Sequence, residues 1–451
     1  MDLIKDDVRK LYYNFLVPAV SGAVAVAAYS IVDTIAIGQG VGVNGTAACA
    51  LVTPIFSIAN FIALICGVGG SVLMSRSRGG GNSEKGNAYF TASIVVVSVL
   101  TIAAWISCVL FQEQFYRLFG ADDVLMPYAK EYGEWIFAFM PSFVMTAFLG
   151  CFVRTDGSPR FVMVSTLIGG VVNIIGDWLF VFPLNMGMAG AAIATVMGSV
   201  IQALLLLGYI LLGKTSMKPV KPFKWMPAFK KTMVTGFGAG ISALSIIAVS
   251  FIANNQIMKY AGGAALAVYG ILSTVSALFT SIFSGIGQAT QPIVSENYGA
   301  GNPKRYWKAE KLGMKSAILF GALFSAVSIA FPVEVVAFFM KITPEVEEVA
   351  PYIMRVFSLS YIPQAVSVFC IYYLPAITHP KMATAISLLR GIILNSAFLM
   401  LFPFLFGSNG IWWAILIGEL VTMLLTAFYM IVLYRRYLYE EKRNVFRTKA
   451  N

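Results

Sequence analysis

The sequence predicts an all-α integral membrane protein, with twelve transmembrane helices in two six-helix lobes that are related by a parallel internal repeat. Three observations predict this fold. Of the 451 residues, 58% are hydrophobic and only 12% are charged, whereas soluble domains carry about 25% charged residues. Apolar runs of about 20 residues, long enough to cross a bilayer, recur along the whole chain. Features of the first half also return roughly 220 residues later.

The predicted spans are bounded by the ends of the apolar runs. They cover residues 14–38, 48–74, 88–111, 128–153, 160–182, 188–212, 232–258, 263–292, 309–333, 349–374, 381–406 and 410–434. A chain of this kind lies in the lipid bilayer, and we expect it to be monomeric and to reside in the inner (plasma) membrane of the cell.

The charges of the gaps between spans predict the orientation. Even-numbered gaps are basic, and the sixth contains six lysines and no acid: Lys214, Lys218, Lys221, Lys224, Lys230 and Lys231. The tail after the last span is basic again, with Arg435, Arg436, Lys442 and Arg443. Apart from Lys259, odd-numbered gaps are neutral or acidic, such as the one with Glu345, Glu347 and Glu348 against Lys341. This positive-inside pattern places both termini in the cytoplasm. It also accounts for the net charge of +11 without nucleic-acid binding.

The repeat predicts where the lobes divide. Gly79-Gly-Gly-Asn82 corresponds to Gly299-Ala-Gly-Asn302, and Ser158-Pro159 corresponds to His379-Pro380. We therefore expect an N-lobe of residues 1–213, a basic cytoplasmic linker of residues 214–231 and a C-lobe of residues 232–451. Two such lobes that rock about a cavity are typical of a carrier.

Three polar side chains lie at one depth within the predicted N-lobe, and a fourth lies one turn deeper. Counting 1.5 Å per residue, Asp33, Asp177 and Thr195 each lie about 9–12 Å below the outer boundary, and Asn173 is one turn deeper on the same face as Asp177. An ionisable group costs at least about 2.5–3.5 kcal/mol at the centre of a membrane and usually marks an ion or substrate path. Carboxylate, amide and hydroxyl oxygens suit Na⁺, and two neighbouring carboxylates would alternatively share a proton.

The second half of the chain retains the glycines and prolines of the repeat but not these acids. About 220 residues after Asp177 and Thr195 stand Phe398 and Ile415. Residues that build a fold should persist in both halves, whereas residues of a site need not. This difference indicates a functional role for the N-lobe acids.

The sequence resembles the multidrug and toxin extrusion (MATE) family over nearly its whole length. The matching stretches are Val32-Asp33-Thr34 with Gly38, Asp156-Gly-Ser-Pro159, Gly190-Ala-Ala-Ile-Ala-Thr195, Gly287-Gln288, Gln291-Pro292 and Asn297-Tyr-Gly-Ala300. It looks most like the DinF-like branch. The resemblance implies a cation site of Asp33, Asn173, Asp177 and Thr195, with the backbone carbonyl of Ala191 as a further ligand. It also implies that Pro18 allows helix 1 to bend on protonation.

The chain departs from the NorM-like branch, which carries acids on helices 7 and 10. Here the polar run of the seventh span is Asn254-Asn255-Gln256, and the tenth span has no acid. Arg390 and Glu419, both about 13 Å deep in the last two spans, form a candidate C-lobe polar pair. We interpret them as a structural ion pair, with a role in substrate binding or coupling as the alternative.

Together these features predict a cation-coupled antiporter. H⁺ or Na⁺ would drive the export of small amphipathic, often cationic, organic compounds by alternating access. We expect no other cofactor and no enzymatic activity, because the sequence has no Walker loop and no paired nucleophile and base. Two alternatives remain open: a dedicated exporter of one natural metabolite, and a flippase for a lipid-linked precursor. The flippase would call for a basic cavity and commonly two extra spans.

Overall fold

The computed structural model describes the backbone of residues 1–213, 215–221, 225–340 and 342–450, and their side chains except at 43 and 440–450. Lys214, Lys224 and Lys341 therefore lie outside the described residues, as do the side chains of Lys442 and Arg443. All regular secondary structure in the described ranges is helical.

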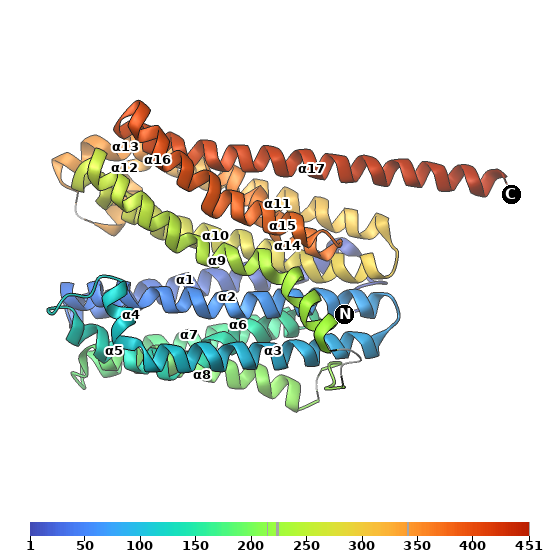
Figure 1. Ribbon diagram of the computed structural model, residues 1–451, viewed down its shortest axis with the longest axis horizontal. Coiled ribbons are helices and arrows are strands. Elements are labelled where there is room, and N and C mark those ends of the chain that lie inside the picture. The colour runs from blue at the N-terminus through green and yellow to red at the C-terminus, as the bar shows by residue number, and fades with distance from the viewer. Residues whose placement is uncertain (214, 222–224, 341, 451) are drawn as a thin grey trace.

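The helices form two bundles, which lie side by side in Figure 1. The N-lobe contains α1 (Val8–Gly40), α2 (Val43–Gly79), α3 (Ser83–Leu110), α4 (Gln112–Leu118), α5 (Met126–Ala138), α6 (Met140–Thr155), α7 (Pro159–Val181) and α8 (Gly187–Leu211). The C-lobe contains α9 (Trp225–Tyr260), α10 (Gly262–Gly299), α11 (Pro303–Ala330), α12 (Pro332–Phe339), α13 (Pro344–Ser358), α14 (Tyr361–Ala376), α15 (Pro380–Leu388), a π-helical turn (Leu389–Ile393), α16 (Leu394–Phe406) and α17 (Ser408–Ala450).

The predicted number of spans agrees with the structure once two bends are included. Among the described residues, ten helices are long and apolar enough to cross a membrane, and two bent pairs, α5 with α6 and α13 with α14, bring the number to twelve. The bends measure 49° and 41°. Pro141 and Pro363 lie at the starts of α6 and α14, where a missing N–H interrupts the helical hydrogen bonds.

The helical C-lobe begins earlier than the predicted linker allows. Residues 225–231, which were expected to be linker, form the first turns of α9. Pro227 lies in the first turn, where the backbone N–H has no partner within the helix and its loss is tolerated. The connection between the last helix of the N-lobe and the first of the C-lobe therefore has 13 residues, 212–224, and those that the structure describes, 212–213 and 215–221, are not helical.

The first part of this connection is anchored to the N-lobe by Asp156. Its carboxylate accepts hydrogen bonds from the Thr215 hydroxyl at 2.7 Å and from the Ser216 backbone N–H at 3.2 Å. Arg78 forms an ion pair with the same carboxylate at 2.8 Å, and the Asp156 side chain is only 3% exposed. Further along, the Val220 N–H donates to Thr91 at 3.0 Å.

The repeat extends to elements that the apolar runs did not predict. The short helices α4 and α12 begin at Gln112 and Pro332, 220 residues apart. The turns after α2 and α10 both require a left-handed residue, and glycine supplies it: φ is +78° at Gly81 and +69° at Gly301.

Glycines allow the lobes to touch through their backbones near the end of the bundle where α1 begins. An added Cβ at Gly69 of α2 would lie 2.1 Å from the Thr232 carbonyl oxygen of α9. At Gly299 of α10 it would lie 2.0 Å from the Arg76 carbonyl oxygen of α2. In Figure 1 the lobes converge at this end and diverge toward the end with α4 and α12. We call the first the closed end and the second the open end.

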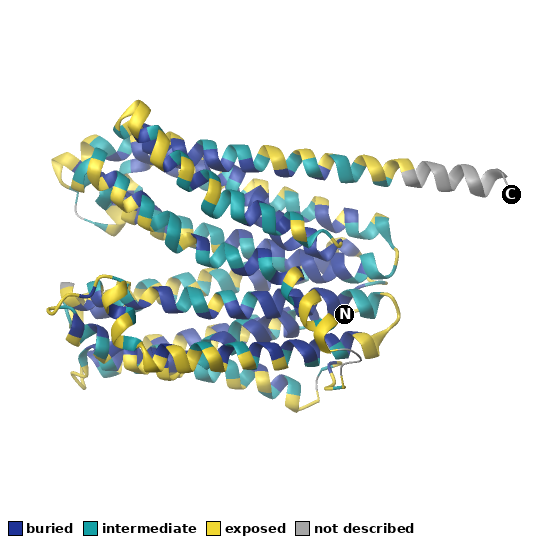
Figure 2. Ribbon diagram, in the orientation of Figure 1, coloured by how far each residue is buried: buried dark blue, intermediate teal, exposed yellow. Residues whose placement is uncertain are grey.

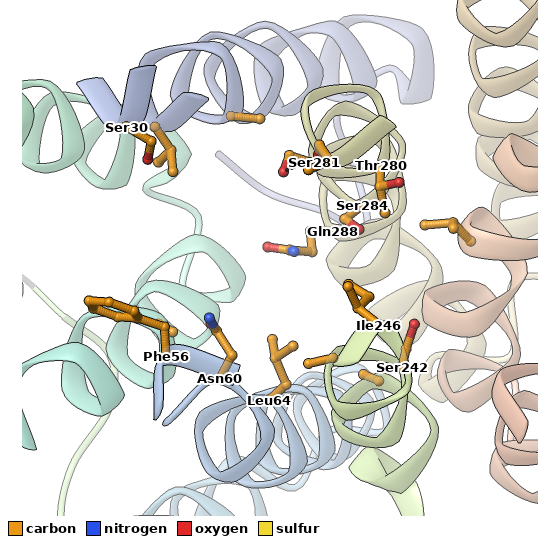
Figure 3. Close-up of a pocket in the computed structure, with 18 of the residues that line it drawn as sticks. Ser30, Phe56, Asn60, Leu64, Ser242, Ile246, Thr280, Ser281, Ser284 and Gln288 are labelled. Carbon is orange, nitrogen blue, oxygen red and sulfur yellow. Dashed lines mark hydrogen bonds between the residues drawn. The ribbon is translucent and has the colours of Figure 1, made fainter. Parts of the chain in front are cut away.

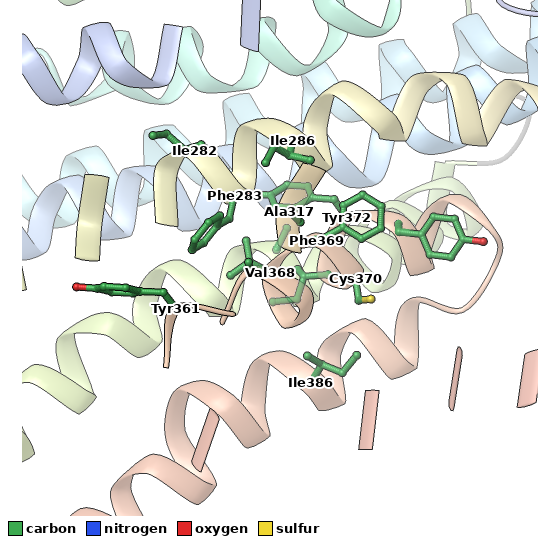
Figure 4. Close-up of a cluster of buried hydrophobic side chains, with 14 of the residues drawn as sticks. Ile282, Phe283, Ile286, Ala317, Tyr361, Val368, Phe369, Cys370, Tyr372 and Ile386 are labelled. Atoms are coloured by element: carbon green, nitrogen blue, oxygen red, sulfur yellow. The ribbon is translucent and has the colours of Figure 1, made fainter. Parts of the chain in front are cut away.

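Each lobe has its own core, and apolar side chains also cover the outside. Figure 4 shows part of the C-lobe core, where Phe283 of α10, Ala317 of α11 and Phe369 of α14 pack together. In Figure 2 exposed residues follow the outer faces of the bundles. Large hydrophobic residues are among them, such as Ile175 at 58% and Phe404 at 76% exposure. Such a surface suits lipid and not water.

Candidate functional site

A cavity of about 790 Å³ lies between the lobes. Its wall includes residues of α1, α2, α6 and α7 from the N-lobe and of α9, α10 and α14 from the C-lobe. Figure 3 shows Asn60 and Leu64 of α2 facing Ser284 and Gln288 of α10 across this space. The volume falls in the range of roughly 300–1,000 Å³ that holds drug-sized ligands.

Small residues bring the three helices of the predicted cation site together. Gly198 of α8 and Gly169 of α7 meet so closely that an added Cβ on either would lie 2.5–2.7 Å from the carbonyl oxygen of the other. An added Cβ at Gly170 would lie 2.8 Å from the Tyr29 ring of α1. Close backbone contact through glycines is a common way to pack membrane helices. Asp33, Asn173 and Thr195 lie on these three helices, each about one turn from such a contact.

These residues form one hydrogen-bonded cluster. The Asn173 side-chain amide donates to the Thr195 hydroxyl at 3.3 Å, and that hydroxyl donates to the Asp33 carboxylate at 3.3 Å. Asp177 follows Asn173 by one turn on the same face of α7, and its carboxyl group is an electrostatic neighbour of Asp33. The structure thus brings together the three side chains that sequence depth placed at one level and Asn173, which was expected one turn deeper.

The cluster contains buried oxygens that have no partner in the protein. Both carboxylate oxygens of Asp177 and the amide oxygen of Asn173 are buried without a hydrogen bond, and Asp177 is 1% exposed. A buried anion needs a compensating charge. Oxygen-only ligands with two acids fit a hard monovalent cation or a proton. Within the described residues, no group of three His, Cys, Asp or Glu side chains is placed to bind a metal ion.

Asp33, Asn173 and Thr195 line the cavity, whereas Asp177 lies behind them. Pro18 also lines the cavity, inside a helix that runs unbroken from Val8 to Gly40. Ala191 is fully buried, one turn before Thr195 on α8. The cluster is therefore within reach of the cavity through Asp33.

Arg390 and Glu419 form an ion pair on the C-lobe side of the same cavity. Nε of Arg390 lies 2.9 Å from the Glu419 carboxylate, and the two side chains are 12% and 6% exposed. Arg390 lies in the π-helical turn Leu389–Ile393. Such turns occur frequently at functional sites. The pairing expected from depth is thus present, on the wall of the cavity.

Sequence reasoning missed two side chains of this region. Tyr132 of α5, 3% exposed, places its hydroxyl within hydrogen-bonding range of Thr195 and lines the cavity beside Asp33. Arg154 of α6 directly follows the predicted fourth span, in one of the even-numbered gaps whose basic residues the charge pattern assigns to the cytoplasm. It nevertheless lines the cavity, and its guanidinium donates to the amide oxygen of Gln288. A basic residue directly at the end of an apolar run was the available signal for Arg154, whereas Tyr132 gave none.

The two helical lobes, the cavity between them and the polar cluster in one lobe define a membrane carrier. The MatE family model matches residues 18–179 and 239–401, which include both lobes. The chain belongs to this family, the MATE transporters, as the resemblance predicted. It is a multi-pass membrane transporter and not an enzyme.

Individual relatives are similar along almost their whole length. The FAD transporter of Shewanella oneidensis is 24% identical over 434 residues, with 93% of each chain covered. The multidrug export protein MepA of Staphylococcus saprophyticus is 23% identical over 424 residues, again with 93% of each chain covered.

Solved structures share the fold. A MOP superfamily transporter from Pyrococcus furiosus, described as having a binding pocket of reversed polarity, superimposes with a TM-score of 0.88 at 21% identity. The outward-facing conformation of a multidrug resistance MATE family transporter does so with a TM-score of 0.88 at 20% identity. In both comparisons 95% of this chain and 96% of the other are covered.

Proposed function

We propose that the protein is an antiporter that exports small amphipathic organic compounds, many of them cationic, in exchange for H⁺ or Na⁺. The observation that carries the proposal is the cluster of Asp33, Asn173, Asp177 and Thr195, with its unpartnered buried oxygens, at the wall of the cavity. The arrangement also agrees with the DinF-like pattern, which supports assignment to that branch. MepA, a relative, is a multidrug export protein, which supports the substrate class.

The proposal includes an orientation in the plasma membrane. The basic gaps lie at the end where α1 begins, and the positive-inside rule assigns that end to the cytoplasm. The closed end then faces the cytoplasm and the open end faces the outside. In this state the cavity would release substrate outward and admit the coupling ion to Asp33. We expect the chain to act as a monomer.

The coupling ion acts by stabilising one of two carrier states. Asp33 and Asp177 repel each other when both are charged, and a proton or Na⁺ between them, with Asn173 and Thr195 as further oxygen donors, would remove that repulsion. Ala191 would add its backbone carbonyl, and Pro18 would allow α1 to bend. An ion shifts the equilibrium between two states only by its difference in affinity for them. The cluster draws on α1, α7 and α8, so movement of α1 would change that affinity.

Export of one natural metabolite is the second candidate. A relative from Shewanella oneidensis is an FAD transporter, and the cavity exposes a guanidinium, that of Arg154, whose hydrogen-bond partner is a neutral amide. A lipid-precursor flippase is less well supported. The described charged residues on the cavity wall are two acids, Asp33 and Glu419, and two bases, Arg154 and Arg390, so the cavity is not basic.

Transport measurements in proteoliposomes test the proposal. The purified protein is reconstituted, and efflux of ethidium is followed under an imposed Na⁺ gradient and, separately, an imposed pH gradient. We expect one gradient to drive efflux, and Asp33→Asn and Asp177→Asn each to reduce that gradient-driven rate at least about tenfold, because each removes a charge that binds the ion.

Asp123→Asn is the matched control. Asp123 is 90% exposed in its ion pair with Arg117, far along the chain from the cluster, and this variant should transport normally. Insertion is checked by the amount of folded protein in the liposomes. Unchanged gradient-driven efflux in both Asp33→Asn and Asp177→Asn would refute the assignment.

A further inference from the structure

The cavity wall carries a guanidinium that has no acidic partner among the described residues. Arg154 lies in the last turn of α6, and its Nη1 donates to the amide oxygen of Gln288 on α10. Within the described part of the chain, Arg154 forms no ion pair. Its ionisable neighbours are Cys151 and Tyr372. A charge removed from bulk water is normally paired with an opposite charge. Arg154 therefore stands out among the charged residues of the cavity.

The other basic group on the described part of the cavity wall is already compensated. Arg390 pairs with Glu419 at 2.9 Å, and the remaining charged residue, Asp33, is an acid of the cation cluster. This leaves Arg154 as the basic group, among the described residues that line the cavity, that can still bind an anionic partner.

Arg154 is also far from the cation cluster. Gly285 of α10 lies against the Ala19 carbonyl of α1, with 3.2 Å between an added Cβ and the oxygen. Gln288, the partner of Arg154, is about one turn closer to the closed end. Asp33 is 14 residues beyond Ala19 in the opposite direction, which corresponds to about 21 Å along α1. Asp33 therefore cannot serve as the counter-ion of Arg154.

The donor geometry suits an oxyanion. An arginine side chain has five N–H donors in a planar fork that binds a carboxylate or phosphate through two parallel hydrogen bonds. Only Nη1 of Arg154 donates to a described residue, so the rest of the fork is available from the cavity. The Gln288 amide, which points into the cavity in Figure 3, and the Tyr372 hydroxyl, 3.5 Å from the Gln288 amide nitrogen, supply further neutral hydrogen-bonding groups.

We propose that Arg154, together with Gln288 and Tyr372, binds an anionic group, a carboxylate or a phosphate, on the exported compound. This inference rests on the proposed export function and narrows its substrate class. The preferred compounds are amphiphiles that carry an acidic group, whether zwitterionic or anionic. Their acidic end lies near the closed end of the cavity. Their apolar part lies against neighbouring wall residues such as Ala19, Val368 and Ile371.

A matched pair of dyes tests the inference by equilibrium binding. Rhodamine 6G is a cationic ester, and rhodamine 19 has the same ring system with a free carboxylate in place of the ester. Binding of each dye to the purified protein is measured by fluorescence polarisation in detergent at pH 7.5, against a blank of empty micelles. The wild-type protein should bind rhodamine 19 more tightly by roughly tenfold or more, the value of a hydrogen-bonded charge pair.

Three variants separate ligand binding from structure. Arg154→Gln removes the charge, and Gln288→Glu gives Arg154 a carboxylate of its own, so both should abolish the preference for rhodamine 19. Arg154→Lys keeps the charge and should keep part of the preference. Arg160→Gln removes a charge from the first turn of α7, where the side chain is exposed and does not line the cavity, and should bind like the wild type.

The outcomes are distinct. If Arg154 only bridged the two lobes, Arg154→Gln would weaken the binding of both dyes equally, or would lower the stability of the protein without changing dye binding. Either result would overturn the inference. Equal affinity of the wild type for the two dyes would also overturn it, while leaving the proposed antiport intact. Failure of the wild type to bind either dye would count against both proposals. No ion gradient enters the experiment, so a failure of coupling cannot imitate a failure of anion binding.

Discussion

Single residues in this carrier differ in energetic importance according to their exposure. Arg390 and Glu419 are 12% and 6% exposed, and each would be a costly uncompensated charge without the other. Lys130 and Glu113 form an ion pair of similar length, 3.0 Å, but are 41% and 53% exposed. Exposed pairs contribute little because water and salt screen them. The same interaction therefore has very different consequences in the two places.

Replacement of Glu419 by Gln should destabilise the folded protein strongly. The change leaves the Arg390 guanidinium in the C-lobe without its counter-charge, at a cost of about 3–5 kcal/mol. Thermal unfolding of the detergent-purified protein measures the effect. Glu113→Gln is the control, and its cost should stay below about 1 kcal/mol. Equal melting temperatures for the two variants would show that the buried pair is not structurally important.

Residues of the candidate site could be predicted from the sequence only where their position depends on depth along a single helix. Asp33, Asn173, Asp177 and Thr195 could be grouped because their distances from the span ends are readable in the sequence. Tyr132 and Arg154 could not, because their places depend on the bend between α5 and α6 and on how closely α6 approaches α10. Those features are set by contacts between distant segments, which one sequence does not display.

At the scale of elements, the crossing of α7 and α8 holds the cation cluster together. The crossing depends on Gly169 and Gly198, whose backbones touch, and Gly198 also lies against Asn173. On the same helix, Gly208 has no neighbouring atom within 4 Å of an added Cβ. Gly198 and Gly208, which lie on the same helix, therefore allow a packed glycine to be compared with an unpacked one.

Gly198→Ala should lower stability by about 1–3 kcal/mol, because the new methyl group overpacks the crossing. It should also reduce gradient-driven efflux, since α8 moves away from α7 and carries Thr195 away from Asn173. Gly208→Ala should be neutral or stabilising by up to about 1 kcal/mol, because alanine favours helix over glycine. Thermal unfolding and proteoliposome efflux of both variants provide the measurement. A harmless Gly198→Ala substitution would contradict the role of the crossing.

The elements that sequence patterns predicted well are the long apolar helices, because membrane hydropathy and loop charge dominate their energetics. Short elements were missed. α4 and α12 have seven and eight residues, too few for a span, and the π-helical turn at Arg390 differs from a regular helix by its hydrogen bonding alone. The first turns of α9 were also assigned to the linker, since their lysines resemble loop charges.

At the scale of the whole molecule, the two lobes touch at one end and separate at the other. The contacts between Gly69 and Thr232 and between Gly299 and Arg76 lie toward the closed end. Ser281 of α10 lines the cavity, and its side chain is exposed (Figure 3). A reagent in water should reach this position from the open end only.

Cysteine labelling tests this asymmetry and the proposed orientation together. The five native cysteines are replaced by alanine, and Ser281→Cys is introduced. In sealed inside-out vesicles, an impermeant maleimide should label Ser281→Cys poorly, and in right-side-out cells it should label it readily. Lys85→Cys, exposed after the turn that follows α2, should show the reverse pattern. Labelling of both positions from one side would contradict the orientation.

The anchoring of the inter-lobe connection by Asp156 limits the carrier's range of motion. Because Thr215, Ser216 and Val220 are hydrogen-bonded to the N-lobe, the tether that follows the C-lobe is only the stretch from Val220 to Trp225, where α9 begins. Five residues extend to about 18 Å at most. The first turn of α9 can thus move no further than that from its anchor while the hydrogen bonds hold. A wider opening would first have to break the hydrogen bond between Val220 and Thr91, and then those between the connection and Asp156. These hydrogen bonds therefore set how far the two lobes can separate.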